Sequence, residues 1–215
     1  MIKVEKLLDV IRTKYPLEKL DAGEFSTMKV SGMTFRVNHY RAKGLGHVST
    51  MEAKGFFGLM KMDTLVIVPF EKDMPLYSYD RILAMGNDTL LVELYDTMVH
   101  PYDASAFDEI GKKYSSVPDR DPGKHWYDDM RLKESISKKA KKEPLLDIAT
   151  EDYLRTFINS KAEDTSDMKE KQRLTDAYVS GLIEHGGPST DVFVKKFGKE
   201  KTREFFETVF FGNKI

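Results

Sequence analysis

The sequence predicts an α+β fold in which helices cover an antiparallel sheet. Runs that alternate apolar and polar residues fill the first half of the chain, and short connections containing Gly or Pro separate them. Helical periodicity dominates the second half, which is the order typical of this class. Because 215 residues are typical of one domain, we expect a single domain over 1–215. Its sheet is expected mostly at 19–97 and its helices mostly at 103–212.

The first element is expected to be an amphipathic helix, and a meander of strands is expected to follow it. Val4, Leu7, Leu8 and Ile11 share one helical stripe. Segments of period two come next, and their short connections contain no helix, so neighbouring strands should pair antiparallel. The predicted strands comprise a hairpin across Ser31-Gly32 and the segments 47–54, 62–69, 76–85 and 89–95.

Helices are expected to dominate after Pro101. Ala104–Tyr114 has helical spacing, and Thr150 with the two acidic residues after it is typical of a helix N-terminus. The basic run Arg131–Lys142 shows no clear periodicity. Further helices are predicted at 168–184, after a cap at Ser189 or Thr190, and in the Phe-rich segment that ends at Gly212.

Composition and charge exclude several classes of protein. Lys and Arg number 34 against 35 Asp and Glu, so we expect no nucleic-acid partner. The absence of cysteine excludes disulfides, a thiolate nucleophile and Cys-ligated zinc or iron–sulfur centres. The longest apolar run, Leu65–Phe70, is far shorter than the ~20 residues of a membrane span. Charges throughout the first residues argue against a signal peptide, so a cytoplasmic protein without a membrane partner is expected.

The sequence gives little support for a dinucleotide-binding loop or a metal site. Gly44-Leu45-Gly46 precedes a strand and lacks a third glycine, so it does not have the context of a dinucleotide-binding loop. The five histidines are scattered. His39 and His47 can meet across a hairpin and bind a metal with a carboxylate, but ordinary strand histidines are more common. We therefore expect no metal site.

Two carboxyl groups fall among apolar residues of predicted strands. Alternation places Asp80 on the face of Leu76 and Ile82, and Glu52 on the face of Val48. A carboxyl on an apolar face is costly to ionise, so its pKa should rise and it can serve as a general acid. The alternative is that Arg81 or Arg41 neutralises Asp80, or that its face is exposed to water.

Two blocks of the sequence resemble the ferredoxin-dependent bilin reductases. The first is VPFEKDMPLYSYDRILAMGNDTLLVELYDT, which resembles the family's Pro-ended strand, its Pro-Leu-x-x-x-Asp segment and a following strand that ends in Asp. The second is FVKKFGKEKTREFFETVFFGN, which is similar to the family's closing Phe-Gly helix with a Phe-rich end. Together they cover about a quarter of the chain, in the family's order. Red chlorophyll catabolite reductase is a divergent relative of this family.

This resemblance implies a fold and a set of site residues. The fold is an α/β/α three-layer sandwich whose bilin lies between the sheet and the C-terminal helices. Asp80 matches the catalytic aspartate. Glu52 matches a glutamate of the family, which would be a second proton donor or a hydrogen-bond anchor. Thr64 stands where one branch of the family has a histidine, and it is expected to hold a water molecule there. Lys138 or Lys139 is expected to pair with a propionate, and Trp126 falls near the family's tryptophan.

The same resemblance implies an activity, a partner and no bound cofactor. The expected function is reduction of a linear tetrapyrrole, with electrons from an external ferredoxin or flavodoxin. These donors are acidic, so a basic docking face is expected. The candidates are one patch of Lys138, Lys139, Lys141 and Lys142, and another of Lys195, Lys196, Lys199 and Lys201.

Two departures from the family pattern keep other functions open. Thr64 replaces the histidine, and Pro188 stands where a basic residue contacts the second propionate. Both favour a non-catalytic protein that binds tetrapyrroles or other planar ligands. A reductase for a different ring-opened pigment, and an unrelated α+β interaction module, are the remaining alternatives.

Overall fold

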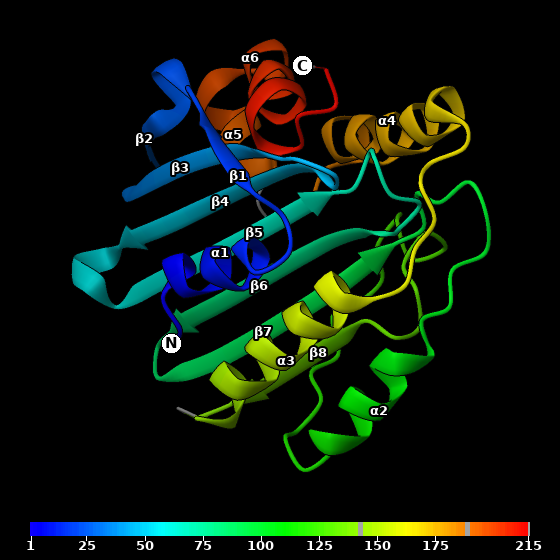
Figure 1. Ribbon diagram of the computed structural model, residues 1–215. Coiled ribbons are helices and arrows are strands. Elements are labelled where there is room, and N and C mark those ends of the chain that lie inside the picture. Colours follow the sequence, from blue (N-terminus) through cyan, green and yellow to red (C-terminus); the bar gives the residue numbers. More distant parts are fainter. Residues whose placement is uncertain (142–143, 188–189, 215) are drawn as a thin grey trace.

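The computed structural model describes residues 1–141, 144–187 and 190–214, and it confirms the predicted α+β class (Figure 1). Within these residues an eight-stranded sheet lies between two groups of helices. The strands are β1 (Leu17–Leu20), β2 (Thr27–Val30), β3 (Met33–Ala42), β4 (Gly46–Gly55), β5 (Met60–Val68), β6 (Leu76–Ala84), β7 (Asn87–Tyr95) and β8 (Ile136–Ala140). The α-helices are α1 (Val4–Arg12), α2 (Ser105–Lys113), α3 (Leu145–Asn159), α4 (Met168–His185), α5 (Thr190–Phe197) and α6 (Lys199–Phe205). Short 3-10 helices, η1 (Gly23–Ser26) and η2 (Phe56–Gly58), and a π-helix, η3 (Phe206–Phe210), complete the order.

The sheet is the predicted antiparallel meander. Its order is β1-β3-β4-β5-β6-β7-β8, and β2 also pairs with β3. From β3 to β7 each strand pairs antiparallel with the next strand in the chain, because short turns join them. The hairpin across Ser31-Gly32 is confirmed as β2 and β3. Both residues of this turn have positive φ, 50° and 78°.

Three elements differ from the sequence-based expectation. Strand β1 precedes the predicted hairpin and pairs with β3. Strand β8 comes from the basic run that showed no periodicity, and it joins the sheet beside β7. Helix α3 begins at Leu145 rather than at Thr150, because Pro144 precedes its first turn. Thr150 is buried inside α3, where its hydroxyl donates to the Leu146 carbonyl at 2.7 Å. A threonine can thus satisfy its hydroxyl within a helix as well as at a cap.

The two faces of the sheet pack against different helices (Figure 1). Helices α1, α2 and α3 share one core with a face that includes Tyr77 and Tyr79. The Tyr77 ring lies 4.8 Å from that of Phe157 in α3. Helices α4, α5, α6 and η3 share the other core, where Phe35 of β3 contacts Phe193 of α5 at 5.1 Å between ring centroids. A cavity also lies on this second face.

Candidate functional site

A cavity of about 170 Å³ lies between the sheet and the C-terminal helices. Alternate residues of β4, β5, β6 and β7 form its floor, because side chains at every second position of a strand share one face. Aromatic residues of α4 and η3 form its roof, and the loop before β8 contributes its rim. The floor residues are Met51, Met62, Thr64, Ser78, Asp80, Ile82, Leu91, Glu93 and Tyr95.

Asp80 occupies the middle of this floor. Its strand pairs with β5 so that Thr64 stands directly opposite, and the Thr64 hydroxyl donates to Asp80 Oδ1 at 2.5 Å. Asp80 is half-buried, and in the described part of the chain no cation pairs with it. Arg81 faces the other side of the sheet, and Arg41 lies on β3, three strands away in the sheet order. The alternative that either arginine neutralises Asp80 is therefore excluded.

Burial raises the pKa of Asp80 to about 6. The hydrogen bond from Thr64 acts in the opposite direction, because it stabilises the carboxylate, and the charge of Glu93 adds to the increase in pKa. A carboxyl with a pKa of about 6 exchanges its proton readily near neutral pH. Asp80 can therefore act as a general acid toward a molecule in the cavity.

Glu93 is a second carboxyl on the same floor that was not singled out from the sequence. Tyr95 donates its hydroxyl to Glu93 at 2.9 Å, and Arg131 donates at 3.0 Å from the segment before β8. Asp128 holds the same guanidinium at 2.9 Å. The alternation that selected Asp80 also places Glu93 with Leu91 on one face of its strand, so the signal was present in the sequence.

The roof of the cavity is the π-helix η3. Its wider turn is closed by the Phe211 amide, which donates to the Phe206 carbonyl five residues earlier at 2.8 Å. Two side chains of β4 hold this turn: His47 Nε2 donates to the Val209 carbonyl at 2.9 Å, and Ser49 donates to the Phe210 carbonyl at 2.5 Å. Burial lowers the pKa of His47 to about 4, so the ring is neutral. π-turns inside helices are frequent at functional sites.

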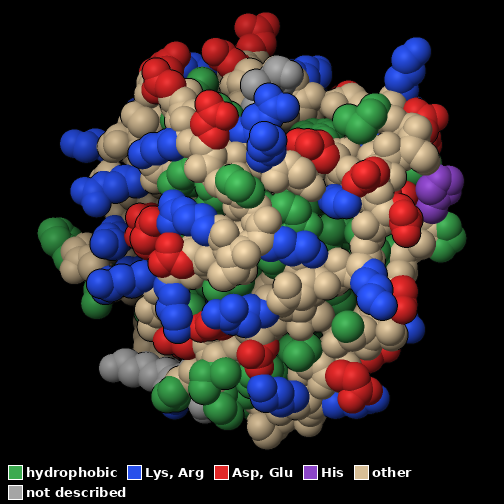
Figure 2. Space-filling model, in the orientation of Figure 1, with side chains coloured by type: hydrophobic (Ala, Val, Ile, Leu, Met, Phe, Trp, Pro, Cys, Tyr) green, Lys and Arg blue, Asp and Glu red, His purple; other side chains and the backbone are tan. Residues whose placement is uncertain are grey.

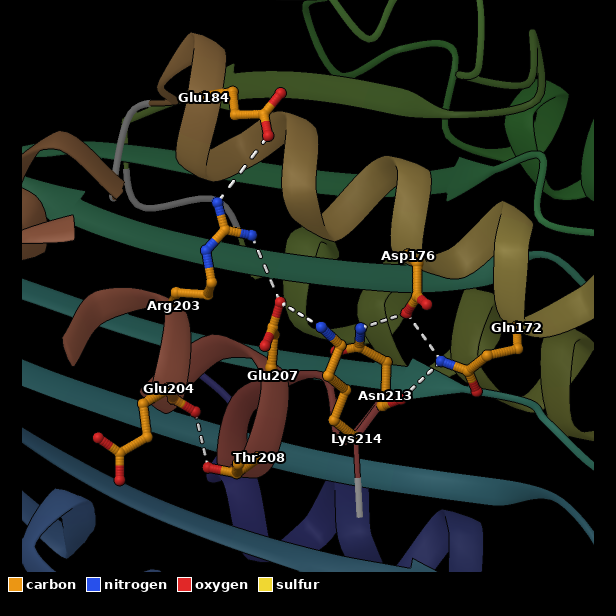
Figure 3. Close-up of polar contacts among 9 residues, drawn as sticks. All are labelled: Gln172, Asp176, Glu184, Arg203, Glu204, Glu207, Thr208, Asn213 and Lys214. Atoms are coloured by element: carbon orange, nitrogen blue, oxygen red, sulfur yellow. Dashed lines mark hydrogen bonds and ion pairs between the residues drawn. The ribbon is translucent and has the colours of Figure 1, made fainter. Parts of the chain in front are cut away.

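Polar contacts also connect the end of η3 to α4 (Figure 3). Glu207 accepts from Arg203 at 3.4 Å and from Lys214 at 3.0 Å. Asn213 donates to Asp176 of α4 at 2.6 Å, and its carbonyl accepts from the Gln172 side chain at 2.5 Å. The cavity roof is therefore fixed both to the sheet below it and to the helix beside it.

The rim carries a cation that sequence analysis did not single out. Arg120 and Pro122 lie in the loop between α2 and β8, and both are half-buried. In the described residues the Arg120 side chain forms no hydrogen bond or ion pair, so its charge is available to a ligand. His125 lines the same rim and stacks on Tyr127, with ring centroids 4.8 Å apart and planes at 8°.

Glu52 does not reach this cavity. Its register partner on β5 is Asp63, whereas Asp80 pairs with Thr64, so the two carboxyls occupy opposite faces of the sheet. Glu52 instead raises the pKa of Asp63, which burial and this charge together bring to about 6. The expectation that Glu52 acts beside Asp80 is corrected by this one-residue difference in register.

The predicted lysines are also placed away from the cavity. Lys138 faces the α2 side, where it is buried and contacts the Val117 carbonyl at 3.1 Å and Asp119 at 2.6 Å. Lys139 is exposed on β8, an outer strand of the sheet, and is not part of the cavity wall. Lys142 and Pro188 lie outside the described residues.

Trp126 and the histidine pair have structural contacts. The Trp126 indole donates to the Gly186 carbonyl at 3.0 Å and covers Gly181 of α4, where an added Cβ would lie 2.2 Å from the ring. The rings of His39 and His47 are 5.4 Å apart, so the expected meeting across the hairpin occurs. In the part of the chain that the structure describes, no group of three or more His, Cys, Asp or Glu is arranged to hold a metal.

Comparisons with known proteins give one kind of match. No family model matches the sequence, and no curated protein matches it. The structure is similar to a crystal structure of phytochromobilin synthase from tomato in complex with biliverdin. The TM-score is 0.74 at 13% sequence identity, and the match covers 98% of this chain and 82% of that chain. At this identity the match shows a shared fold.

Proposed function

We propose that this protein binds a linear tetrapyrrole in the cavity and reduces it with electrons from a ferredoxin or flavodoxin. The observation that carries the proposal is Asp80, an acid without a cationic partner in the described residues and with a pKa of about 6, in the cavity floor. The fold shared with the biliverdin-bound synthase supports a pigment of this class, and so does the pair of sequence blocks that resemble the bilin reductases.

Asp80 supplies protons in this reaction. Two electrons arrive one at a time from the external donor, and two protons complete the reduction of one double bond of the pigment. Asp80 gives a proton to the reduced pigment and regains one from water that enters through the open rim. The Thr64 hydroxyl stabilises the carboxylate left after each transfer, because it donates to Oδ1 at 2.5 Å.

Arg120 is the proposed partner of a pigment carboxylate, in place of Lys138 or Lys139. It lines the rim, and an Arg–carboxylate pair can form two parallel hydrogen bonds. A volume of about 170 Å³ is below the ~300–1,000 Å³ of most ligand pockets, so the pigment requires the rim to move outward. Residues 121–125 of the rim have no regular secondary structure, and loops move with least loss of structure.

The electron donor is proposed to dock on α5 and the start of α6, next to the cavity roof. Lys195, Lys196 and Lys199 are exposed there, while Lys201 is paired with Glu24. The other predicted patch is weaker, because Lys138 is buried and paired. An acidic donor on the lysines of α5 and α6 predicts a reduction rate that falls steeply with added salt. A rate that is flat with salt contradicts this docking site.

A second candidate function is binding of the pigment without reduction. Two observations favour it: Thr64 is not an ionisable group, and Glu52 lies on the other face of the sheet. The site then holds one acid with a raised pKa instead of two. The two functions differ in one measurement, the absorption spectrum of the bound pigment before and after a reduced donor is added.

The test is a titration with biliverdin followed by reduced ferredoxin. We expect a new absorption band on binding, followed by loss of that band on reduction. The Asp80→Asn variant should keep binding but lose turnover by about 10²-fold or more, which is the usual contribution of a general acid. The matched control is Asp63→Asn, because Asp63 also has a pKa of about 6 but faces the other side.

Each outcome separates the alternatives. Turnover that survives Asp80→Asn rejects the role of Asp80, and equal loss in Asp63→Asn indicates a general effect on the fold. Bound pigment that ferredoxin leaves unchanged indicates a carrier. If biliverdin shifts neither the spectrum nor the melting temperature, the protein does not bind a tetrapyrrole.

A further inference from the structure

The hairpin between β4 and β5 exposes a cluster of large apolar side chains. Phe57 is 108% exposed relative to a reference residue, Leu59 is 71% exposed and Phe56 is 55% exposed. Met85, 93% exposed, lies at the tip of the neighbouring β6–β7 hairpin, since Met60 pairs with Ala84. We call these four residues the apolar tip. In Figure 2 apolar side chains project at the left edge of the molecule, where Figure 1 places the β4–β5 hairpin.

The backbone of the apolar tip is strained. Phe56 and Phe57 have φ values of 50° and 56°, a region that residues other than Gly rarely adopt. Two consecutive aromatic residues in this conformation are held out into solvent instead of folding back onto the sheet. Conformations of this kind persist only where the surrounding structure holds them, and they are common at functional sites.

Lysines stand directly behind the apolar tip. Lys54 and Lys61 face each other in the register of β4 and β5, and Lys29 continues the same row through Thr34. We call Lys29, Lys54 and Lys61 the lysine row. All three are exposed and, among the described residues, none forms an ion pair. Glu52 and Asp63 lie two positions along the same strands on this face, and Lys54 and Lys61 both lower the pKa of Asp63. Like charges opposite each other destabilise a sheet, so a further anion beside the three lysines is favourable.

We propose that the apolar tip and the lysine row bind the surface of an anionic lipid bilayer. Aromatic and aliphatic side chains enter the boundary between headgroups and acyl chains, while lysines contact anionic headgroups. A protein partner is less well matched, because specific interfaces cover ~800 Å² and 20–30 residues on each side, and the tip offers only four large apolar side chains.

Such binding is peripheral and separate from the chemistry of the cavity. In the described residues no helix is both long and apolar enough to cross a membrane. The residues of the apolar tip do not line the cavity, so binding to lipid does not depend on the proposed reduction. The inference changes the sequence-based expectation of a protein without a membrane partner.

The test is sedimentation of the whole protein with vesicles. We expect binding to vesicles of phosphatidylcholine with phosphatidylserine, and much weaker binding to pure phosphatidylcholine or at high salt. Phe56→Ser with Phe57→Ser should weaken binding at least about tenfold, because two aromatic groups no longer leave water. Lys54→Gln with Lys61→Gln should weaken it by about fivefold for each charge removed.

Matched controls separate the tip from general effects. Met168→Ser removes an apolar side chain that is 52% exposed at the start of α4. This variant should bind vesicles as the wild type does. Lys195→Gln with Lys196→Gln removes the same two charges from α5 and should also bind normally. The proposal is overturned if the wild type does not bind anionic vesicles, or if the control variants lose as much binding as the variants of the apolar tip and the lysine row. It is also overturned if the phenylalanine variants only convert a dimer into a monomer, because the tip then joins two copies of the chain.

Discussion

The two faces of strand β6 differ in whether a charged side chain has a partner of opposite charge. Arg81, 1% exposed, points toward α1 and α3 and binds Asp88 with two hydrogen bonds, at 2.5 and 2.8 Å. Asp80, its neighbour in the chain, lines the cavity and accepts a hydrogen bond from Thr64, and among the described residues no cation pairs with it. On this face the fold pairs the buried guanidinium with a carboxylate. On the cavity face it leaves an acid ready to exchange a proton, which is the arrangement that a reaction site needs.

The aromatic residues of the two faces differ in the same way. Tyr77 and Phe157 fill the space between the sheet and α3. On the other face Phe206 and Phe210 line the cavity, and His47 and Ser49 tie the backbone carbonyls of their π-helix to the sheet. The space left below them is the cavity. The predictions below test this contrast between a closed face and an open one.

The largest effect is expected on the closed face. Arg81→Met leaves Asp88 buried without its cation, so the free energy of unfolding should fall by about 3–5 kcal/mol. Urea unfolding measures this change. The double variant Arg81→Met with Asp88→Leu should recover most of it, because both charges are then removed. A loss below about 1 kcal/mol in the single variant would show that the pair is not essential to this face.

A smaller effect is expected where the roof meets the sheet. At Gly212 φ is 58°, and an added Cβ would lie 2.3 Å from the His47 ring. Gly212→Ala should therefore destabilise the protein by about 2–4 kcal/mol in thermal or urea unfolding. Gly198→Ala is the control: its φ is 81° with nothing within 4 Å of the new Cβ, so about 1 kcal/mol is expected. Equal losses would mean that the contact with His47 does not hold the roof.

The smallest effect has the opposite sign. The pKa of Asp80 is about 6 in the folded state, above its ordinary value of 3.8, so the folded protein binds more protons between these pH values. Stability should fall as the pH rises through this window. Asp80→Asn removes the free-energy cost of ionising this buried carboxyl. It should stabilise the protein by about 1–2 kcal/mol near neutral pH and not at all below about pH 4. Unfolding curves over this pH range measure it. A variant that is destabilised at neutral pH would place a cation beside Asp80.

Much of the sheet was predictable from the sequence, including the face of each strand. Alternation put Asp80 with Leu76 and Ile82, and the structure shows that grouping. The same rule correctly grouped Glu52 with Val48, but it does not say which faces of two strands coincide. That depends on the register between β4, β5 and β6, and register is set by turns and tertiary packing.

Other parts of the site depend on segments that carry no local signal. Strand β8 is polar and basic, so its place in the sheet follows from pairing with β7 and not from its composition. Arg120 reaches the rim only because the loop before β8 runs beside that strand, where the Arg120 amide donates to the Ser137 carbonyl at 2.9 Å. A cation in an irregular loop cannot be assigned to a site without that contact.

The sequence by itself determined the class of fold, the antiparallel order of the strands from β2 to β7 and the presence of an acid on an apolar strand face. These properties follow from short-range periodicity and from turn residues, which act over a few positions. Tertiary structure decided that Glu93 and Arg120, and not Glu52 or Lys138, share the cavity with Asp80. It also decided that a π-helix forms the roof. These properties depend on register and on contacts between distant segments, for which the energies are set by packing in three dimensions and not by neighbours along the chain.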